Sequence, residues 1–231
     1  MKASVLPSDE GRTVGCRIRG LYAITPDMTD TVALVAATRQ TLEGGARLIQ
    51  YRNKAACRAL RLEQASSLAR LCREFHVPLI INDHADLADE VGADGVHLGR
   101  GDARIPEARL RIGKDKIIGI SCYNRLEYAL QAEHQGADYV AFGAFFTSVT
   151  KLDTVPAPIH LLRQARRGLS VPIVAIGGIT PENACQLLGT GADAVAVSNA
   201  LFNAADIWEA ERNFSCRIEN SSLHNYSGFS Q

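Results

Sequence analysis

The chain has 231 residues with 25 basic and 25 acidic side chains, so its formal net charge is zero. Apolar residues make up 46% of the sequence and charged residues 22%, which is typical of a soluble globular protein and excludes a disordered or collagen-like chain. Zero net charge removes the general attraction on which nucleic-acid binding depends. A few local cations can still hold a small anionic ligand.

The sequence carries no targeting or membrane signal that we can identify. No apolar run approaches the roughly 18–20 residues that span a bilayer, and residues 1–19 lack the apolar stretch of a signal peptide. The six cysteines are scattered and form no Cys-x-x-Cys pair, so we expect neither disulfides nor zinc. These observations predict a cytoplasmic protein that binds neither a membrane nor nucleic acid.

Strand-like and helix-like stretches alternate along the chain. Short runs rich in Ile, Val, Leu and Ala predict β-strands at residues 20–25, 47–51, 77–82, 95–98, 116–121, 139–142, 171–177 and 194–198. Longer stretches between them carry apolar residues at helical spacing, most clearly at residues 31–42 and 58–75. Nearly continuous apolar strands are typical of a parallel sheet that is covered on both faces.

An internal repeat narrows the choice of fold. A Gly-Ala step starts at residues 45, 92, 136 and 191, just before every second predicted strand. The Gly ends the preceding helix, and the Ala packs where strand and helix meet. Eight strand–helix units with this rhythm favour a (β/α)8 barrel, in which alternate strands supply alternate interior layers. The alternative is a doubly wound open sheet, which would usually show a Gly-rich fingerprint after the first strand.

We therefore predict an α/β fold with a single (β/α)8, or TIM, barrel at residues 19–213. Residues 1–18 form an N-terminal extension without periodicity. Residues 214–231 are rich in Ser and Asn and are interpreted as a loosely ordered tail.

Polar side chains at the carboxyl ends of the strands are the candidates for an active site, since barrel sites lie there. Three of them are cations, Arg52, Lys54 and Lys151. If the chain stays extended, Gln50 shares one face with Arg52 and Lys54. A single surface cation is more often an ordinary ion-pairing group. Three cations at one rim favour a polyanion such as a pyrophosphate.

Two acids follow neighbouring predicted strands. Asp83 and Asp102 would lie on the same rim, and two carboxylates together with substrate phosphates commonly hold Mg²⁺. Each acid also has a simpler interpretation. Asp83 suits a helix N-cap, and Asp102 suits a loop turn.

A further candidate is a phosphate site at the last two strands. Gly177-Gly178 and Ser198-Asn199 follow these strands, where barrels frequently bind phosphate through backbone N–H groups. The long stretch 143–155 is interpreted as a lid that orders on ligand binding, with plain disorder as the alternative.

Together these segments resemble the thiamine-phosphate synthase family over about residues 21–201. The resemblance is carried by Leu21-Tyr22-Ala23-Ile24-Thr25, Gln50-Tyr51-Arg52-Asn53-Lys54, Ile80-Ile81-Asn82-Asp83, Gly95-Val96-His97-Leu98-Gly99, Ser121, Thr150-Lys151, Ala175-Ile176-Gly177-Gly178 and Gly191-Ala192-Asp193. It implies a barrel enzyme of thiamine biosynthesis, a transferase that joins hydroxymethylpyrimidine pyrophosphate to thiazole phosphate. The products are thiamine phosphate and pyrophosphate, formed by a dissociative, Mg²⁺-assisted step.

The resemblance also implies roles for individual residues. The pyrimidine pyrophosphate would be bound by Gln50, Tyr51, Arg52, Asn53, Lys54, Asn82, Ser121 and Lys151. Within this set, the catalytic residues would be Arg52, Lys54, Ser121 and Lys151. The thiazole phosphate would be bound by Ser148, Thr150, Gly178, Ser198 and Asn199. Asp83 and Asp102 would hold Mg²⁺.

Three segments depart from the family pattern. Thr147-Ser148 stands where Pro-Thr is usual, Ser198-Asn199 where an aliphatic residue and Ser are usual, and Arg100-Gly101 where Gln-Glu is usual. Two alternatives therefore remain at the level of sequence. One is a thiazole-phosphate tautomerase or another phosphate-binding isomerase, and the other is a non-catalytic paralogue that only binds the ligand.

Overall fold

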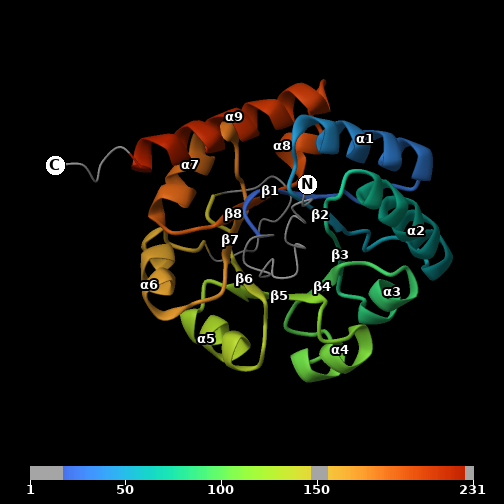
Figure 1. Cartoon of the computed structure of the whole chain (residues 1–231), viewed down its shortest axis with the longest axis horizontal. Coiled ribbons are helices and arrows are strands. Elements are labelled where there is room, and N and C mark those ends of the chain that lie inside the picture. The colour runs from blue at the N-terminus through green and yellow to red at the C-terminus, as the bar shows by residue number, and fades with distance from the viewer. Residues whose placement is uncertain (1–17, 147–155, 227–231) are drawn as a thin grey trace, which may run out of the picture.

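The computed structural model describes residues 18–146 and 156–226. Within these residues, eight parallel strands pair in chain order and β8 pairs with β1, so the sheet closes into a barrel. The helices surround the strands as an outer ring (Figure 1). The predicted (β/α)8 barrel is therefore confirmed.

The observed elements lie close to the stretches expected from the sequence. The strands are β1 (Gly20–Ile24), β2 (Leu48–Tyr51), β3 (Leu79–Asn82), β4 (Gly95–Leu98), β5 (Ile117–Tyr123), β6 (Tyr139–Phe142), β7 (Ile173–Ile176) and β8 (Ala194–Val197). The helices are α1 (Thr31–Gly44), α2 (Arg58–Glu74), α3 (Ala85–Glu90), α4 (Ile105–Ile112), α5 (Leu126–His134), α6 (His160–Gly168), α7 (Pro181–Thr190), α8 (Asn199–Phe202) and α9 (Ile207–Tyr226).

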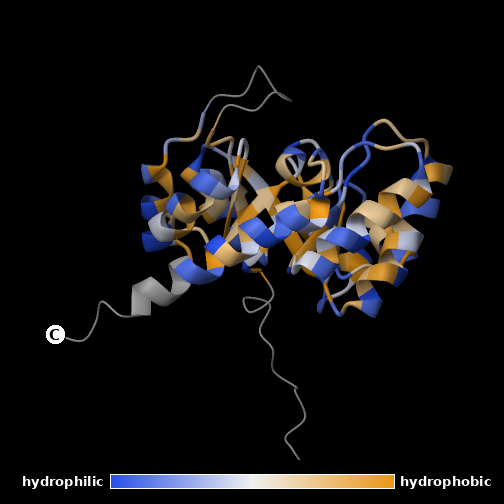
Figure 2. Ribbon diagram, turned by 90° about the horizontal axis from the view of Figure 1, so that it is seen from above, coloured by the Kyte–Doolittle hydropathy of each residue, from blue (hydrophilic) through white to orange (hydrophobic). Residues whose placement is uncertain are grey.

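Alternation along the strands divides the buried side chains into two cores. One set fills the barrel and comprises Ile18, Tyr22, Ile24, Leu48, Ile80, Ile117, Tyr139, Ala141, Val174, Ala194 and Ala196. The larger set lies between the strands and the helices. Figure 2 shows hydrophilic and hydrophobic residues mixed along the helices, as expected when one helix face packs on a barrel and the other meets solvent. No helix among the described residues is long and apolar enough to cross a membrane.

The repeated Gly-Ala steps join neighbouring strands at the amino-terminal end of the barrel. In three of the four steps the next residue is an aspartate. Its carboxylate accepts a backbone N–H from the start of the preceding strand, with N–O distances of 2.9 Å for Asp94, 2.7 Å for Asp138 and 2.7 Å for Asp193. Arg109 and Arg166 pair with the second and third of these carboxylates. Each aspartate thus fixes an odd strand to the even strand that follows it.

The end of the chain differs from the expected loose tail. Helix α9 continues to Tyr226 and lies beside α1 and α7 (Figure 1). Phe214 and Ile218 are 0% and 9% exposed, and Ser215 donates to the buried Glu211 carboxylate at 2.6 Å. The prediction of a tail from residue 214 was wrong because the Ser- and Asn-rich composition concealed a helical spacing of a few apolar residues. Ile18, assigned to the extension, is fully buried in the barrel.

We predict that Asp138→Ala destabilises the barrel, because the Ile118 N–H and the Arg109 guanidinium lose their acceptor. The expected loss is about 1–3 kcal/mol, the cost of an unpaired buried donor. Each kcal/mol corresponds to a fall in Tm of about 2–4 °C in a chain of this size. Thermal unfolding followed by circular dichroism measures it. Asp115→Ala, which removes an exposed carboxylate, is the matched control, and equal Tm values for the two variants would contradict the prediction.

Candidate active site

The candidate residues of β2 occupy one face of the strand and its extension. Gln50 is 3% exposed and donates from Nε2 to the Tyr22 hydroxyl inside the barrel at 2.7 Å. Two and four residues later, Arg52 and Lys54 leave the strand at the rim. The alternation of side chains places Gln50 inside the barrel, and the Lys54 ammonium reaches Asp83 after β3.

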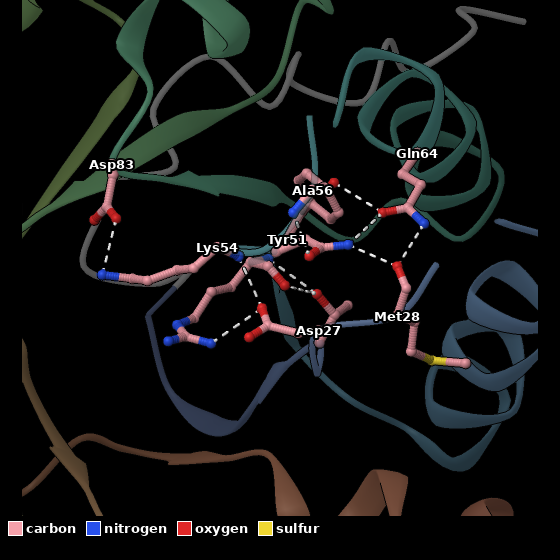
Figure 3. Close-up of polar contacts among 10 residues, drawn as sticks. Asp27, Met28, Tyr51, Lys54, Ala56, Gln64 and Asp83 are labelled. Carbon is pink, nitrogen blue, oxygen red and sulfur yellow. Dashed lines mark hydrogen bonds and ion pairs between the residues drawn. The ribbon is translucent and has the colours of Figure 1, made fainter. Parts of the chain in front are cut away.

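Tyr51 and Asn53 point the other way, so their expected role in substrate binding is not supported by their placement. The Tyr51 hydroxyl donates to Gln64 of α2 at 2.9 Å. The Asn53 amide donates to the Met28 carbonyl at 2.6 Å and to Gln64 at 3.0 Å (Figure 3). Both side chains hold the turn between β2 and α2 against the loop after β1. Because side chains alternate along the segment, the two neighbours of Arg52 face α2 instead of the barrel mouth.

Asp27, in the loop after β1, orients the cationic segment. Its Oδ1 accepts the Lys54 backbone N–H at 2.8 Å and lies 3.4 Å from the Arg52 guanidinium. Thr25 adds two more bonds, since its hydroxyl accepts the Arg52 N–H and donates to the Arg52 carbonyl. Sequence reasoning did not identify Thr25 or Asp27 as site residues. Both follow the carboxyl end of β1, which is where the active-site residues of barrels usually lie.

The two candidate metal ligands lie together. The Lys54 ammonium is 3.2 Å from Asp83 Oδ2 (Figure 3). Asp102 accepts the Gly99 N–H. Burial raises the pKa of the Asp102 carboxyl, and the neighbouring Asp83 raises it further, while the Gly99 N–H and Lys54 oppose the rise. Burial is the main cause of the raised pKa, and the part that comes from Asp83 shows that the two carboxylates are neighbours, as two ligands of one cation would be.

The donor set therefore suits a hard divalent cation. The described residues contain no group of three or more His, Cys, Asp or Glu side chains that could hold a metal. Two carboxylates without further protein ligands are how Mg²⁺ is commonly held when substrate phosphates complete its coordination. The alternative role of Asp83 as a helix N-cap is not observed, since His84 takes that position and the Asp83 carboxylate pairs with Lys54. Asp102 does act as a turn residue, since it accepts the Gly99 N–H, but its carboxylate also lies beside Asp83.

A chain of hydrogen bonds crosses the barrel interior below the rim. Tyr139 Oη lies 2.8 Å from Tyr22 Oη and 2.8 Å from His97 Nδ1, and His97 Nε2 lies 2.8 Å from Ser121 Oγ. With the Gln50 contact, the chain joins two candidate substrate residues on β2 and β5. His97 is a buried member of this chain. The two tyrosines escaped the sequence reasoning, although each is a polar group in an otherwise apolar strand.

The candidates for the thiazole phosphate lie on another part of the rim, whereas Asn82 is next to Asp83 on the side of the acids. Gly178 follows β7 with φ 62°, and its carbonyl accepts from the Asn183 amide of α7 at 3.1 Å. Ser198 and Asn199 follow β8, where the Ser198 carbonyl accepts the N–H groups of Leu201 and Phe202. Asn82 ends β3 beside His97 of β4. The strand order places the acids and cations on β2 to β4 and the phosphate candidates on β7 and β8.

Ser148, Thr150 and Lys151 lie outside the described residues, so their placement does not enter the site. The described residues on either side of these positions are joined, because the Ala157 N–H donates to the Ala144 carbonyl at 2.7 Å. The Phe145 and Phe146 N–H groups donate to the end of β7.

An open hollow of about 360 Å³ lies where the chain leaves β4 and β5. It is lined by Arg100, Tyr123, Asn124, Arg125 and Tyr128. Arg100 stands where the family pattern has an acidic segment, between Gly99 and Asp102, which are joined by the hydrogen bond from the Gly99 N–H to the Asp102 carboxylate. The departure in sequence therefore adds positive charge to this side of the mouth.

A closed barrel with its ionisable groups gathered at the carboxyl ends of the strands defines a (β/α)8-barrel enzyme. Comparison with known proteins narrows this class. The family model for thiamine monophosphate synthase matches residues 21–201, and on this match the chain belongs to that family.

Individual relatives agree with the family model. Thiamine-phosphate synthase of Nitrosospira multiformis is 64% identical over 207 residues, which cover 90% of this chain and 88% of that protein. The synthase of Nitrosomonas eutropha is 54% identical over 86% of this chain and 94% of its own length. Among solved structures, thiamine phosphate pyrophosphorylase of Pyrococcus furiosus superposes with a TM-score of 0.79 at 37% identity, over 87% of this chain and 96% of that one.

We predict that His97 stays neutral throughout the physiological pH range. Burial lowers its pKa from 6.5 to about 4, and the nearby Asp83 opposes the shift only in part. Because the pKa is lower in the folded state, the contribution to stability is complete above pH 6.5 and is lost as pH falls toward 4. An NMR titration of the imidazole, assigned with the His97→Gln variant, should show a midpoint near pH 4. A midpoint near 6.5 would contradict this.

Proposed function

We propose that this chain joins hydroxymethylpyrimidine pyrophosphate to thiazole phosphate and releases thiamine phosphate and pyrophosphate. Family membership supports the reaction. The observation that carries it is the meeting of Lys54 with the Asp83 and Asp102 carboxylates at the barrel mouth, since a cation next to an acid pair suits a metal-bound pyrophosphate. The substrates are small phosphorylated molecules, and we propose that the enzyme works in the cytoplasm.

Asp83 and Asp102 would hold Mg²⁺. The metal, when bound, neutralises charge on the pyrophosphate oxygens. Lys54, whose ammonium pairs with Asp83, stays beside the ligand and adds a second positive charge.

Arg52 and Lys54 would bind the pyrophosphate and stabilise it as it leaves. Their backbone is fixed by Asp27 and Thr25, so the cations are oriented before substrate arrives. Preorganised charge of this kind is worth more than the same charge in water, because nothing has to reorganise during the reaction. Lys151, outside the described residues, is proposed to complete the set.

The chemical step needs no protein nucleophile. The bond between the pyrimidine methylene carbon and the pyrophosphate oxygen breaks, and its electron pair leaves with the pyrophosphate. The electron-rich aminopyrimidine stabilises the resulting cation until the thiazole nitrogen donates its lone pair and forms the new C–N bond. The task of the protein is to position the two partners and to exclude water, which competes for the cation.

The thiazole phosphate would bind on the opposite part of the rim, at Gly178, Ser198 and Asn199. These residues follow β7 and β8, where barrels frequently hold phosphate. We propose that Ser148 and Thr150 reach the same phosphate. An isomerase acting on a thiazole phosphate alone would have no use for the acid pair on β3 and in the loop after β4, so this alternative is not favoured.

The direct test mixes the purified protein with both phosphorylated halves, with and without Mg²⁺, and follows thiamine phosphate and pyrophosphate by chromatography. We expect both products in equal amounts only when Mg²⁺ is present. Tight binding of either half without product would indicate a non-catalytic ligand-binding protein and would overturn the proposal.

We further predict that Asp83→Asn and Asp102→Asn each lower kcat/KM by about 10²–10³-fold, the loss expected when a group that stabilises transition-state charge is removed. The Mg²⁺ concentration for half-maximal rate should rise in both. Asp86→Asn, on the exposed face of α3, is the matched control and should leave both quantities unchanged. If the double variant kept Mg²⁺-dependent turnover at the original level, the metal assignment would be wrong.

A further inference from the structure

The buried chain of hydrogen bonds begins and ends at a candidate substrate residue, and its three middle members lie inside the barrel below the rim. It runs from Gln50 through Tyr22, Tyr139 and His97 to Ser121, with contacts of 2.7, 2.8, 2.8 and 2.8 Å. Tyr22 and Tyr139 are no more than 1% exposed, and His97 is 8% exposed. Water does not reach the middle members, so each proton in the chain has to find its acceptor within the chain.

With the Gln50 amide oriented as in the structure, one complete order of protons follows along the chain. The Gln50 amide donates to the Tyr22 oxygen. A phenol has a single proton, so Tyr22 donates to Tyr139, and Tyr139 donates to Nδ1 of His97. A neutral imidazole that accepts at Nδ1 carries its proton on Nε2, and this proton goes to Ser121 Oγ. The Ser121 hydroxyl proton is then free of the chain.

The opposite order of donors also satisfies every group, but only if all the hydrogen bonds in the chain reverse together. Ser121 would donate to His97, His97 to Tyr139, Tyr139 to Tyr22, and Tyr22 to a rotated Gln50 amide. A mixed order leaves a buried donor or acceptor unpaired, at a cost of about 1–3 kcal/mol. The chain therefore has two states, and a group bound at one end selects the state at the other.

We infer that Tyr22, Tyr139 and His97 are positioning residues that set Gln50 as an acceptor and Ser121 as a donor toward the bound pyrimidine pyrophosphate. The inference rests on the proposed function. The amino group of an aminopyrimidine needs an acceptor, and pyrophosphate oxygens need donors. Only the first direction supplies both, because it leaves Gln50 Oε1 and the Ser121 proton unused inside the barrel.

Exposure and packing support this assignment. Among the described residues, the sole side-chain polar atom that is sealed from solvent without a partner is Glu211 Oε2, so Gln50 Oε1 is not a sealed atom that lacks a partner. The Tyr139 ring stacks on His97 with a centroid distance of 5.6 Å and meets Tyr22 edge-on at 6.1 Å. Such packing holds the three rings in place, so the direction of the hydrogen bonds between them can reverse without any movement of the rings.

The first test reads the proton order with hydroxymethylpyrimidine pyrophosphate bound and without thiazole phosphate, so that no thiamine phosphate can form. Nitrogen NMR of the His97 imidazole should show a neutral ring protonated at Nε2 and bare at Nδ1. A neutral ring protonated at Nδ1 would overturn the inference. This measurement needs no turnover, so it remains decisive even if the protein were to make no thiamine phosphate and the proposed function failed.

The second test measures coupling between the two ends. Gln50→Met and Ser121→Ala are combined in a double-mutant cycle on kcat/KM, once in the natural chain and once with Tyr139→Phe. We expect the two effects to be coupled by about tenfold in the natural chain and to be independent once the central hydroxyl is removed. Tyr139→Phe alone should lower kcat/KM by about tenfold.

Tyr51→Phe is the matched control. It also removes one buried hydroxyl from a strand, but that hydroxyl bonds Gln64 outside the chain. A purely structural role for Tyr139 predicts that both variants lower Tm and leave the coupling intact, and this result would overturn the inference. Loss of coupling in Tyr139→Phe but not in Tyr51→Phe would support it.

Discussion

The pairing of β8 with β1 is the contact on which the rest of the structure depends. Four registered positions, from Gly20 with Ala194 to Ala23 with Val197, turn an open sheet into a ring. Closure brings all eight carboxyl ends to one mouth, and it brings Tyr22 of β1 across the barrel from Tyr139 of β6. An open sheet with the same strands would keep β1 and β6 far apart, so the interior chain of hydrogen bonds could not form.

Much of the fold could be predicted because the signals are periodic. Continuous apolar runs gave the strands within a few residues, and the Gly-Ala rhythm gave the barrel. Three of the Gly-Ala steps are followed by the aspartates that bind neighbouring strands together. This role is visible only in the three-dimensional structure. Composition was the weaker guide. It suggested a loose tail where a few apolar residues at helical spacing, such as Phe214 and Ile218, are sufficient to hold α9 on the barrel.

The site divides in a similar way. Alternation predicted that Gln50, Arg52 and Lys54 share a face, but a family motif read as a block also included Tyr51 and Asn53, which the same alternation turns toward α2. The Tyr22 and Tyr139 hydroxyls could not have been joined by sequence reasoning, because 117 residues separate them and only the closed ring brings them to 2.8 Å. Zero net charge is equally uninformative about the mouth, where Lys54, Asp83 and Asp102 are neighbours.

Gly119 of β5 shows how the barrel makes room for its polar interior. A Cβ at this position would overlap the ring of Tyr139, on the neighbouring strand β6. The missing side chain is thus the space in which the tyrosine lies. Any larger residue here would evict a ring and separate Tyr22 from His97, even though position 119 has no functional group and touches no ligand. The glycine at position 119 therefore determines the structure of the site as much as the charged residues at its rim do.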